Sequence, residues 1–165
     1  MSDTQPTSYM QALSNDLLEY LEKKAGSTAK DKFDAFMVSG DVKPSFKNMG
    51  DGMVVCRLQY TAQFSFEDLP TGLIDPRVIF ARVTTWLFAN DPMRDRLKLS
   101  TPSMDIDAYQ MGELADLDIT IEFIEDVPMR EAQGGDVNYN GKAWQIEPFK
   151  IYTAENGQVG LDERN

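Results

Sequence analysis

The sequence predicts an α+β protein in which a mostly antiparallel sheet is covered on one face by two helices. Near the N-terminus, apolar residues recur at the spacing of one face of an α-helix. Residues 53–66 and 117–123 instead alternate between apolar and polar side chains, which is the pattern of a strand with one buried and one wet face. Sheets that are wet on one face are characteristically antiparallel. Together these observations predict the α+β class.

The first helix is predicted over residues 7–25. Its apolar stripe consists of Met10, Leu13, Leu17, Leu18 and Leu21. Thr7 or Ser8 can cap its N-terminus, and Gly26 is expected to end it, because glycine readily adopts the left-handed conformation that closes many helices. The polar residues 27–32 are expected to form a connector.

Three extended segments are expected next. Residues 33–38 are predicted as a short strand that ends at the turn residues 39–41, and residues 44–52 leave room for a short edge strand. The clearest strand spans residues 53–66. Its apolar side is formed by Cys56, Leu58, Tyr60, Ala62, Phe64 and Phe66. Residues 67–71 are expected to be a loop.

The second helix is predicted to begin after Asp75, because an N-cap carboxylate is followed by Pro76 at the first helical position. It should end by Asn90 or Asp91, because Pro92 disfavours helical geometry in the residue before it. Its apolar stripe consists of Ile79, Val83, Trp86 and Leu87.

The remaining elements are strands over residues 103–108 and 116–125 and a hairpin over residues 136–144. The hairpin should turn at Asn140-Gly141, a pair that suits the tightest hairpin turns. An edge strand at residues 151–152 could follow. We expect one domain over residues 1–153 and a flexible tail over residues 154–165, which are rich in Gly, Glu and Asp.

Composition excludes several functional classes. The formal charge of −11 comes from 27 acidic and 16 basic residues, which argues against a general nucleic-acid binder because phosphate binding needs concentrated Lys and Arg. Cys56 is the single cysteine, so an intramolecular disulfide and a cysteine-based zinc site are excluded. The N-terminus lacks the features of a signal peptide, and no apolar run is long enough to span a bilayer. We therefore expect a cytoplasmic protein without a membrane partner.

The sequence offers little catalytic chemistry. It contains no histidine, which excludes every site that needs imidazole, and no glycine pattern fits a phosphate-binding loop. No catalytic or cofactor-binding residue is predicted, although general acid–base work by carboxylates stays open.

Residues 136–147 match the oxygen-ligand pattern of a calcium loop. The matching residues are Asp136, Asn138, Asn140, Gly141 and Glu147. The flanking residues Gly134, Gly135 and Pro148 stand where that motif requires helices. The pattern therefore favours a polar hairpin turn, and whether calcium binds stays open.

A second candidate is an acidic group on two predicted strands: Asp105, Asp107, Asp116 and Asp118. If the strands pair, the four carboxylates could converge on a divalent cation or form a glycosidase-type acid pair. The alternative is a solvated outer face, on which opposed carboxylates repel one another. Trp86 could likewise be an exposed binding anchor, but its helical spacing favours core packing.

The order of these elements resembles the phage tail completion protein R family of contractile-tailed temperate phages. The matching residues are Trp86-Leu87 with Asn90 and Pro92, Asp105-Ile106, and Asp118-Ile119-Thr120-Ile121 running into Glu125. Upstream, Phe36-Met37-Val38-Ser39-Gly40 and the long strand after Gly52 fit in the same order, so the likeness covers about residues 10–150.

The resemblance implies a structural subunit, not an enzyme, with a tail-terminator-like fold. It would complete the head-proximal end of a phage or prophage tail, stop the polymerisation of tube or sheath, and meet the head-completion protein. Related terminators form rings, often hexameric. The resemblance implies no cofactor, and it places the protein in the host cytoplasm during assembly and then in the virion tail. Acidic side chains could line the ring channel so that passing DNA does not adhere.

Two other classes stay open on the residues alone. One is a divalent-metal-dependent enzyme that uses Asp105, Asp107, Asp116 and Asp118. The other is a small partner-binding or assembly-chaperone module, which would be monomeric and not ring-forming.

Overall fold

The computed structural model describes residues 6–149 and confirms the α+β class. Along the chain its elements are α1 (Tyr9–Asp31), β1 (Phe33–Asn48), β2 (Met53–Pro70), α2 (Pro76–Asn90), β3 (Ser103–Tyr109), β4 (Leu114–Glu131), β5 (Val137–Tyr139) and β6 (Lys142–Ile146). The strands form a six-stranded sheet in the order β1-β2-β4-β6-β5, and β3 pairs with the other end of β4. Every strand pair is antiparallel.

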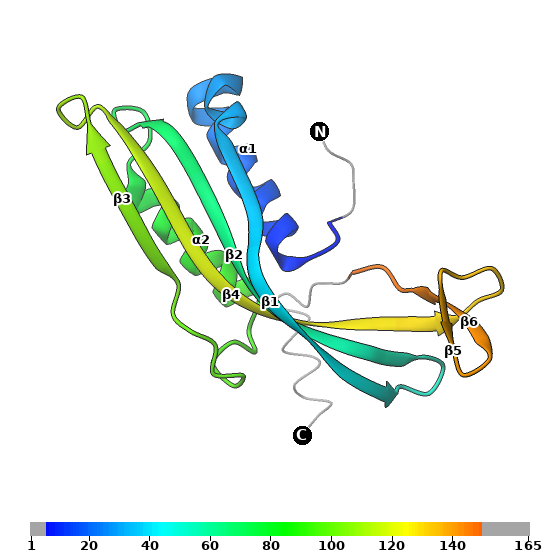
Figure 1. Ribbon diagram of the computed structural model, residues 1–165. Helices are drawn as coiled ribbons and strands as arrows, with labels where there is room; N and C mark the ends of the chain where they lie inside the picture. Colours follow the sequence, from blue (N-terminus) through cyan, green and yellow to red (C-terminus); the bar gives the residue numbers. More distant parts are fainter. Residues whose placement is uncertain (1–5, 150–165) are drawn as a thin grey trace.

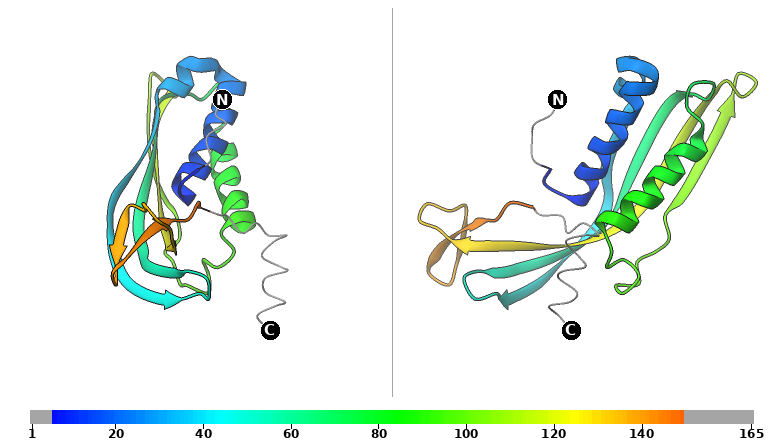
Figure 2. Two further views of the ribbon diagram at one scale, coloured as in Figure 1. Left: turned by 90° about the vertical axis from the view of Figure 1, so that its right-hand side faces the viewer. Right: turned by 180° about the vertical axis from the view of Figure 1, so that it is seen from behind.

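The sheet has two parts because β1, β2 and β4 continue past the helices. We call the helix-covered part the body; there α1 and α2 lie on the same face of the sheet (Figures 1 and 2). We call residues 42–58 and 125–147 the arm. In the arm the three long strands run on without a helix over them and carry the β5–β6 hairpin at their end (Figure 1).

The core fills the space between the helices and the inner face of the body sheet. Phe64 of β2 and Phe123 of β4 are fully buried there, and Leu13, Leu17 and Ile79 reach them from the helices with no exposed surface. The alternating apolar residues of β2 and β4 lie opposite one another: Phe64 pairs with Ile119, and Tyr60 pairs with Phe123. Both predicted strands therefore direct their apolar residues to one common face.

The predicted end of the first helix was wrong. Gly26 does adopt a positive φ of 79°, but the chain re-enters helical geometry and α1 reaches Asp31. Gly26 therefore produces a kink where the sequence suggested a stop, and residues 27–31 form a last helical turn in place of the expected connector. The helix is closed at Lys32, whose backbone N–H donates to the carbonyls of Ala29 and Lys30.

The predicted turn at residues 39–41 was also wrong, because β1 runs through it to Asn48. A register shift between Met37 and Ser39 places Val38 in a bulge, which lets the strand continue. Gly40 serves close packing here: a Cβ atom at this position would lie 2.7 Å from Cβ of Tyr60. Residues 67–71 are likewise not all loop, since β2 extends to Pro70.

The other predicted elements are confirmed. The Asp75 carboxylate accepts the backbone N–H of Arg77 at 2.9 Å, so it caps α2 as expected. The hairpin turns at Asn140 and Gly141, with φ of 56° and 76°. The strands expected at residues 103–108 and 116–125 are β3 and the central part of β4. The predicted strand at 151–152 and the tail at 154–165 lie outside the described residues.

Candidate functional site

The four aspartates of the acidic group are brought together as the pairing hypothesis required. Asp105 of β3 lies opposite Asp118 of β4, and Asp107 lies opposite Asp116, all on the outer face of the sheet. Asp118 accepts the Ser65 hydroxyl at 2.6 Å, and Asp116 accepts the backbone N–H of Asp68 at 3.0 Å. Across residues 6–149, no group of three or more carboxylate or cysteine side chains is arranged to hold a metal ion. The geometry is that of a solvated strand face.

The residues of the calcium-loop pattern form a β-hairpin in place of an ion-binding loop between helices. The segment is divided between β5 and β6, which pair directly. The Glu147 carboxylate, which would complete the ligand set, instead accepts the Arg130 guanidinium at 3.3 Å. Its oxygen is therefore held toward β4 and away from the turn.

The other two residues that the sequence singled out lie at intermediate depth. Trp86 packs against the core from α2 and meets the Tyr9 ring edge to face at 6.3 Å. This agrees with core packing more than with an exposed anchor. Cys56 is half-buried on the inner face of β2, opposite Pro44 of β1 and Val127 of β4.

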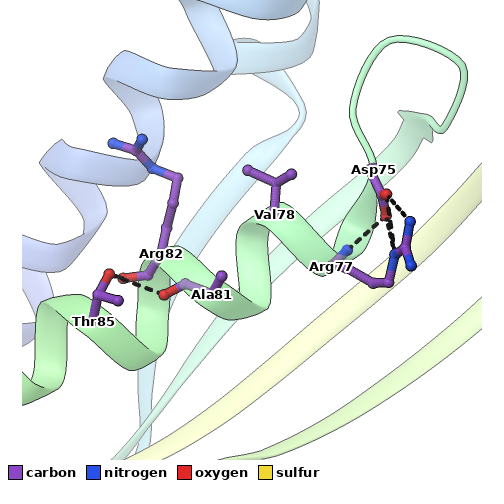
Figure 3. Close-up of a pocket in the computed structure, with 6 residues that line it drawn as sticks. All are labelled: Asp75, Arg77, Val78, Ala81, Arg82 and Thr85. Carbon is purple, nitrogen blue, oxygen red and sulfur yellow. Dashed lines mark hydrogen bonds and ion pairs between the residues drawn. The ribbon is translucent and has the colours of Figure 1, made fainter.

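A shallow hollow on the surface of α2 offers no catalytic set (Figure 3). It is lined by Asp75, Arg77, Val78, Ala81, Arg82 and Thr85. Its carboxylate is already engaged, since Asp75 accepts the Arg77 guanidinium at 2.7 Å; this hydrogen bond lowers the pKa of Asp75. Arg82 extends toward α1, where it pairs with Asp16 at 3.3 Å.

A buried carboxyl lies where the body meets the arm, and sequence reasoning missed it. Glu125 falls in phase with the apolar residues of β4 and is buried. It accepts the Tyr60 hydroxyl and, at 2.9 Å, the backbone N–H of Tyr9 in the first turn of α1. Burial raises the pKa of Glu125, although both hydrogen bonds oppose the rise. The sequence signal for this site is a glutamate at a position where the alternation of β4 otherwise places apolar residues.

We expect Glu125→Gln to remove one part of the pH dependence of stability. A carboxyl whose pKa is raised by folding binds more protons in the native state, so stability falls as pH rises from about 4 through the folded pKa. Each unit of that rise corresponds to about 1.4 kcal/mol. In urea denaturation between about pH 4 and pH 8, the free energy of unfolding of the variant should increase relative to that of the parent as pH rises. A constant difference would contradict this assignment.

A second buried group, around Arg94, holds the connector between α2 and β3. Its guanidinium donates to Asp91 at 3.0 Å, to the carbonyl of Glu122 at 2.8 Å and to the carbonyl of Ser100 at 3.0 Å. The Ser100 N–H in turn donates to the Glu122 carboxylate at 2.9 Å. Because residues 91–102 lead directly into β3, this network positions the edge of the body sheet.

The surfaces best suited to assembly are the two edges of the body sheet and the arm. Neither the outer edge of β1 nor that of β3 is paired within residues 6–149. The exposed large apolar residues of β1, the β1–β2 turn and the β5–β6 hairpin are Phe36, Met37, Val38, Val42, Phe46, Met49, Tyr139 and Ile146. Exposed strand edges with apolar side chains are templates for pairing with another chain.

The outer face of the sheet, which no helix covers, is acidic. Register places the basic residues Lys43 and Arg57 on it. Its carboxylates are Asp34, Asp41, Asp105, Asp107, Asp116, Asp118, Glu122 and Asp126. Eight carboxylates against these two basic side chains make this side of the molecule negatively charged.

Comparisons with known proteins agree with a tail-assembly role. The family model described as P2 phage tail completion protein R (GpR) matches residues 10–148. A protein of Haemophilus phage HP1 (strain HP1c1), described as an uncharacterized 19.2 kDa protein in the rep-hol intergenic region, is 34% identical over 105 residues. That alignment covers 64% of this chain and 63% of the relative. No solved structure matches significantly.

In the described part of the chain, neither helix is long and apolar enough to cross a membrane. The family match spans all of α1 except its first residue, the whole of α2 and the whole sheet. The chain belongs to the P2 phage tail completion protein R family, a family of structural phage-tail proteins.

Proposed function

We propose that this chain caps the head-proximal end of a phage tail as a closed ring, for which six copies is the expected number. The cap stops polymerisation of the tail tube or sheath and presents a surface to the head-completion protein. The observation that carries the proposal is the family match over residues 10–148. The mechanism is steric: a ring that fits the last tube or sheath ring on one side offers no site for the next subunit.

The arm supports this function because it extends an apolar surface beyond the helix-covered body. Val42 and Met49 are exposed on it. Neither α1 nor α2 lies over this part of the sheet (Figure 1). A surface of this kind is suited to docking on a protein ring, since burying apolar area drives most protein association. The arm is therefore the part of the subunit proposed to contact the tail.

The direct test is assembly without the protein. Host cells that produce the phage with this gene deleted should release tails of irregular length without heads, and a plasmid copy should restore normal particles. Electron microscopy of the lysates gives both tail length and head attachment. Tails of normal length with heads attached in the deletion strain would refute the proposal.

The arm can be tested in the same complementation strain. We expect Val42→Asp with Met49→Asp to leave folding intact but to fail in tail completion, because two charges would be placed at a docking surface. Leu73→Asp is the matched control, since Leu73 is equally exposed but lies in the turn before α2, at the far end of the body. Equal complementation by both variants would exclude the arm as the docking surface.

The acidic outer face has its own expected role in this ring. If it lines the channel, its carboxylates repel passing DNA, because like charges prevent non-specific adhesion. We expect Asp34→Asn with Asp41→Asn to slow DNA ejection while particles still assemble. Ejection is measured from purified phage with a DNA-binding dye. Unchanged ejection kinetics would count against a channel-facing position.

A separate variant tests the alternative of a metal-dependent enzyme. Particles with Asp116→Asn and Asp118→Asn should still assemble, whereas a metal-dependent enzyme would lose its activity.

A further inference from the structure

The two edges of the body sheet are compatible with each other in strand direction. In the lateral order β1-β2-β4-β3, each strand is antiparallel to the next, so β1 and β3 run in opposite directions. Copies related by rotation about an axis roughly along the strands keep these directions. The β3 edge of one copy would then meet the β1 edge of the next as an antiparallel pair, and the alternation of the sheet would continue unbroken.

The apolar core is left open at both of these edges. On the inner face, Met104 and Ile106 of β3 are 54% and 40% exposed, although their partners Ile119 and Leu117 on β4 are buried. Met37 of β1 is 50% exposed, although its partner Ala62 is fully buried. A strand added along β3 would cover Met104 and Ile106 and extend the inner face that the helices occupy.

The charges on the two edges favour a staggered pairing. Asp105 and Asp107 on the β3 edge form no ion pair in the described part of the chain, and the distal half of β1 carries Lys43 and Lys47. Pairing without a stagger would instead set Asp34 opposite Asp105, since Phe33 and Ile106 lie level across the sheet. Opposed carboxylates repel, and strands of a closed sheet must be staggered in any case.

We propose that neighbouring copies join head to tail, with the β3 edge of one copy pairing antiparallel to the distal β1 edge of the next. A second copy is the occupant that fits, because one chain carries both complementary edges. Such a heterologous contact generates a ring when the rotation closes. The result is one continuous sheet around the ring, with the helices on one face and the acidic side chains on the other. This inference rests on the ring of the proposed function and names the contact that forms it.

Cross-linking in assembled tails tests the contact. In a Cys56→Ala background, Ser45→Cys on β1 and Ser103→Cys on β3 provide one thiol at each edge, and both native serines are exposed. A flexible bis-maleimide tolerates a register error of two residues, about 7 Å. The double variant should give a ladder of covalent oligomers on a denaturing gel, and each single variant should remain monomeric.

Two results would overturn the proposal. Covalent dimers from the Ser45→Cys variant alone would show that β1 pairs with itself. Absence of a ladder in tails that are complete and infectious would show that the edges are apart, and the proposed capping function would survive. Normal tails in the deletion strain would refute capping instead, so the two failures can be told apart.

Charge exchange supplies a second measurement if the cysteine variants fail to assemble. Lys43→Asp with Lys47→Asp, and separately Asp105→Lys with Asp107→Lys, should each lower the yield of infectious particles at least roughly tenfold, because like charges then face each other. Combining all four substitutions should restore most of the yield. A combined variant that is no better than either pair would contradict edge pairing.

Discussion

Arg94→Met should lower the free energy of unfolding by about 3 kcal/mol at neutral pH, the loss expected when one partner of a buried ion pair is removed. The side chains of Arg94 and Asp91 are only 12% and 4% exposed. Methionine cannot replace the three hydrogen bonds of the guanidinium, so Asp91 and two backbone carbonyls would lose their donors. Urea denaturation followed by circular dichroism measures the loss.

Two matched variants separate the charge effect from general damage. Asp91→Asn in the Arg94→Met background should recover much of the stability, because it removes the unpaired buried charge. Arg77→Met should have no measurable effect, since the Arg77 side chain is 86% exposed in its pair with Asp75. Burial already raises the pKa of Asp91. The Arg94→Met loss should therefore shrink in acid, where Asp91 becomes protonated; a loss independent of pH would contradict this cause.

Phe123→Ala should cost about 3–5 kcal/mol, the range for deleting a fully buried phenyl ring. Phe123 has no exposed surface, and its ring stacks with Tyr9 at 5.6 Å and lies 5.7 Å from the ring of Tyr60. The cavity would open at the junction of β2, β4 and the start of α1. Phe88→Ala is the control within α2, because Phe88 is 80% exposed.

Chemical denaturation measures the stability of the two Phe variants, and near-ultraviolet circular dichroism measures their aromatic signal. Phe123→Ala should also weaken the aromatic signal, since the ring environment of Tyr9 and Tyr60 changes. Phe88→Ala should leave both stability and signal close to the parent. A loss for Phe123→Ala no larger than that for Phe88→Ala would show that the junction is not the centre of the packed core.

Periodicity predicted those elements in which burial imposes a pattern. β2 and β4 alternate because one face packs on the helices, and α2 is bounded by Asp75 and Pro92, whose local chemistry leaves few alternatives. The hypothesis about the acidic group required the two predicted strands to pair, and the structure places Asp105 opposite Asp118. Two paired strands with the same apolar–polar alternation bring their polar residues to one face.

The missed features share a physical cause. β1 is exposed along most of its length, so no alternation marks its true extent, and Gly40 suggested a turn where it permits close packing against Tyr60. The division into body and arm depends on where the helices lie, which no single segment encodes. Glu125 and Arg94 were unrecognised as sites because no local sequence pattern marks the tertiary contacts that complete them. Glu125 accepts the N–H of Tyr9, 116 residues away, and Arg94 donates to the carbonyl of Glu122, 28 residues away.

The strand order has a consequence for how the chain folds. β1 and β2 are joined by a short turn, with Asn48 paired to Met53, so this hairpin can form from local contacts. β4 sits on the other side of β2, and there Met53 pairs with Met129, after α2 and β3 have been made. Because long loops close more slowly than short ones, the central strand pair of the sheet should form late. Until β4 pairs with β2, both edges of the β1–β2 hairpin are exposed. Repulsion between chains that each carry a net charge of −11 opposes their association before β4 has paired.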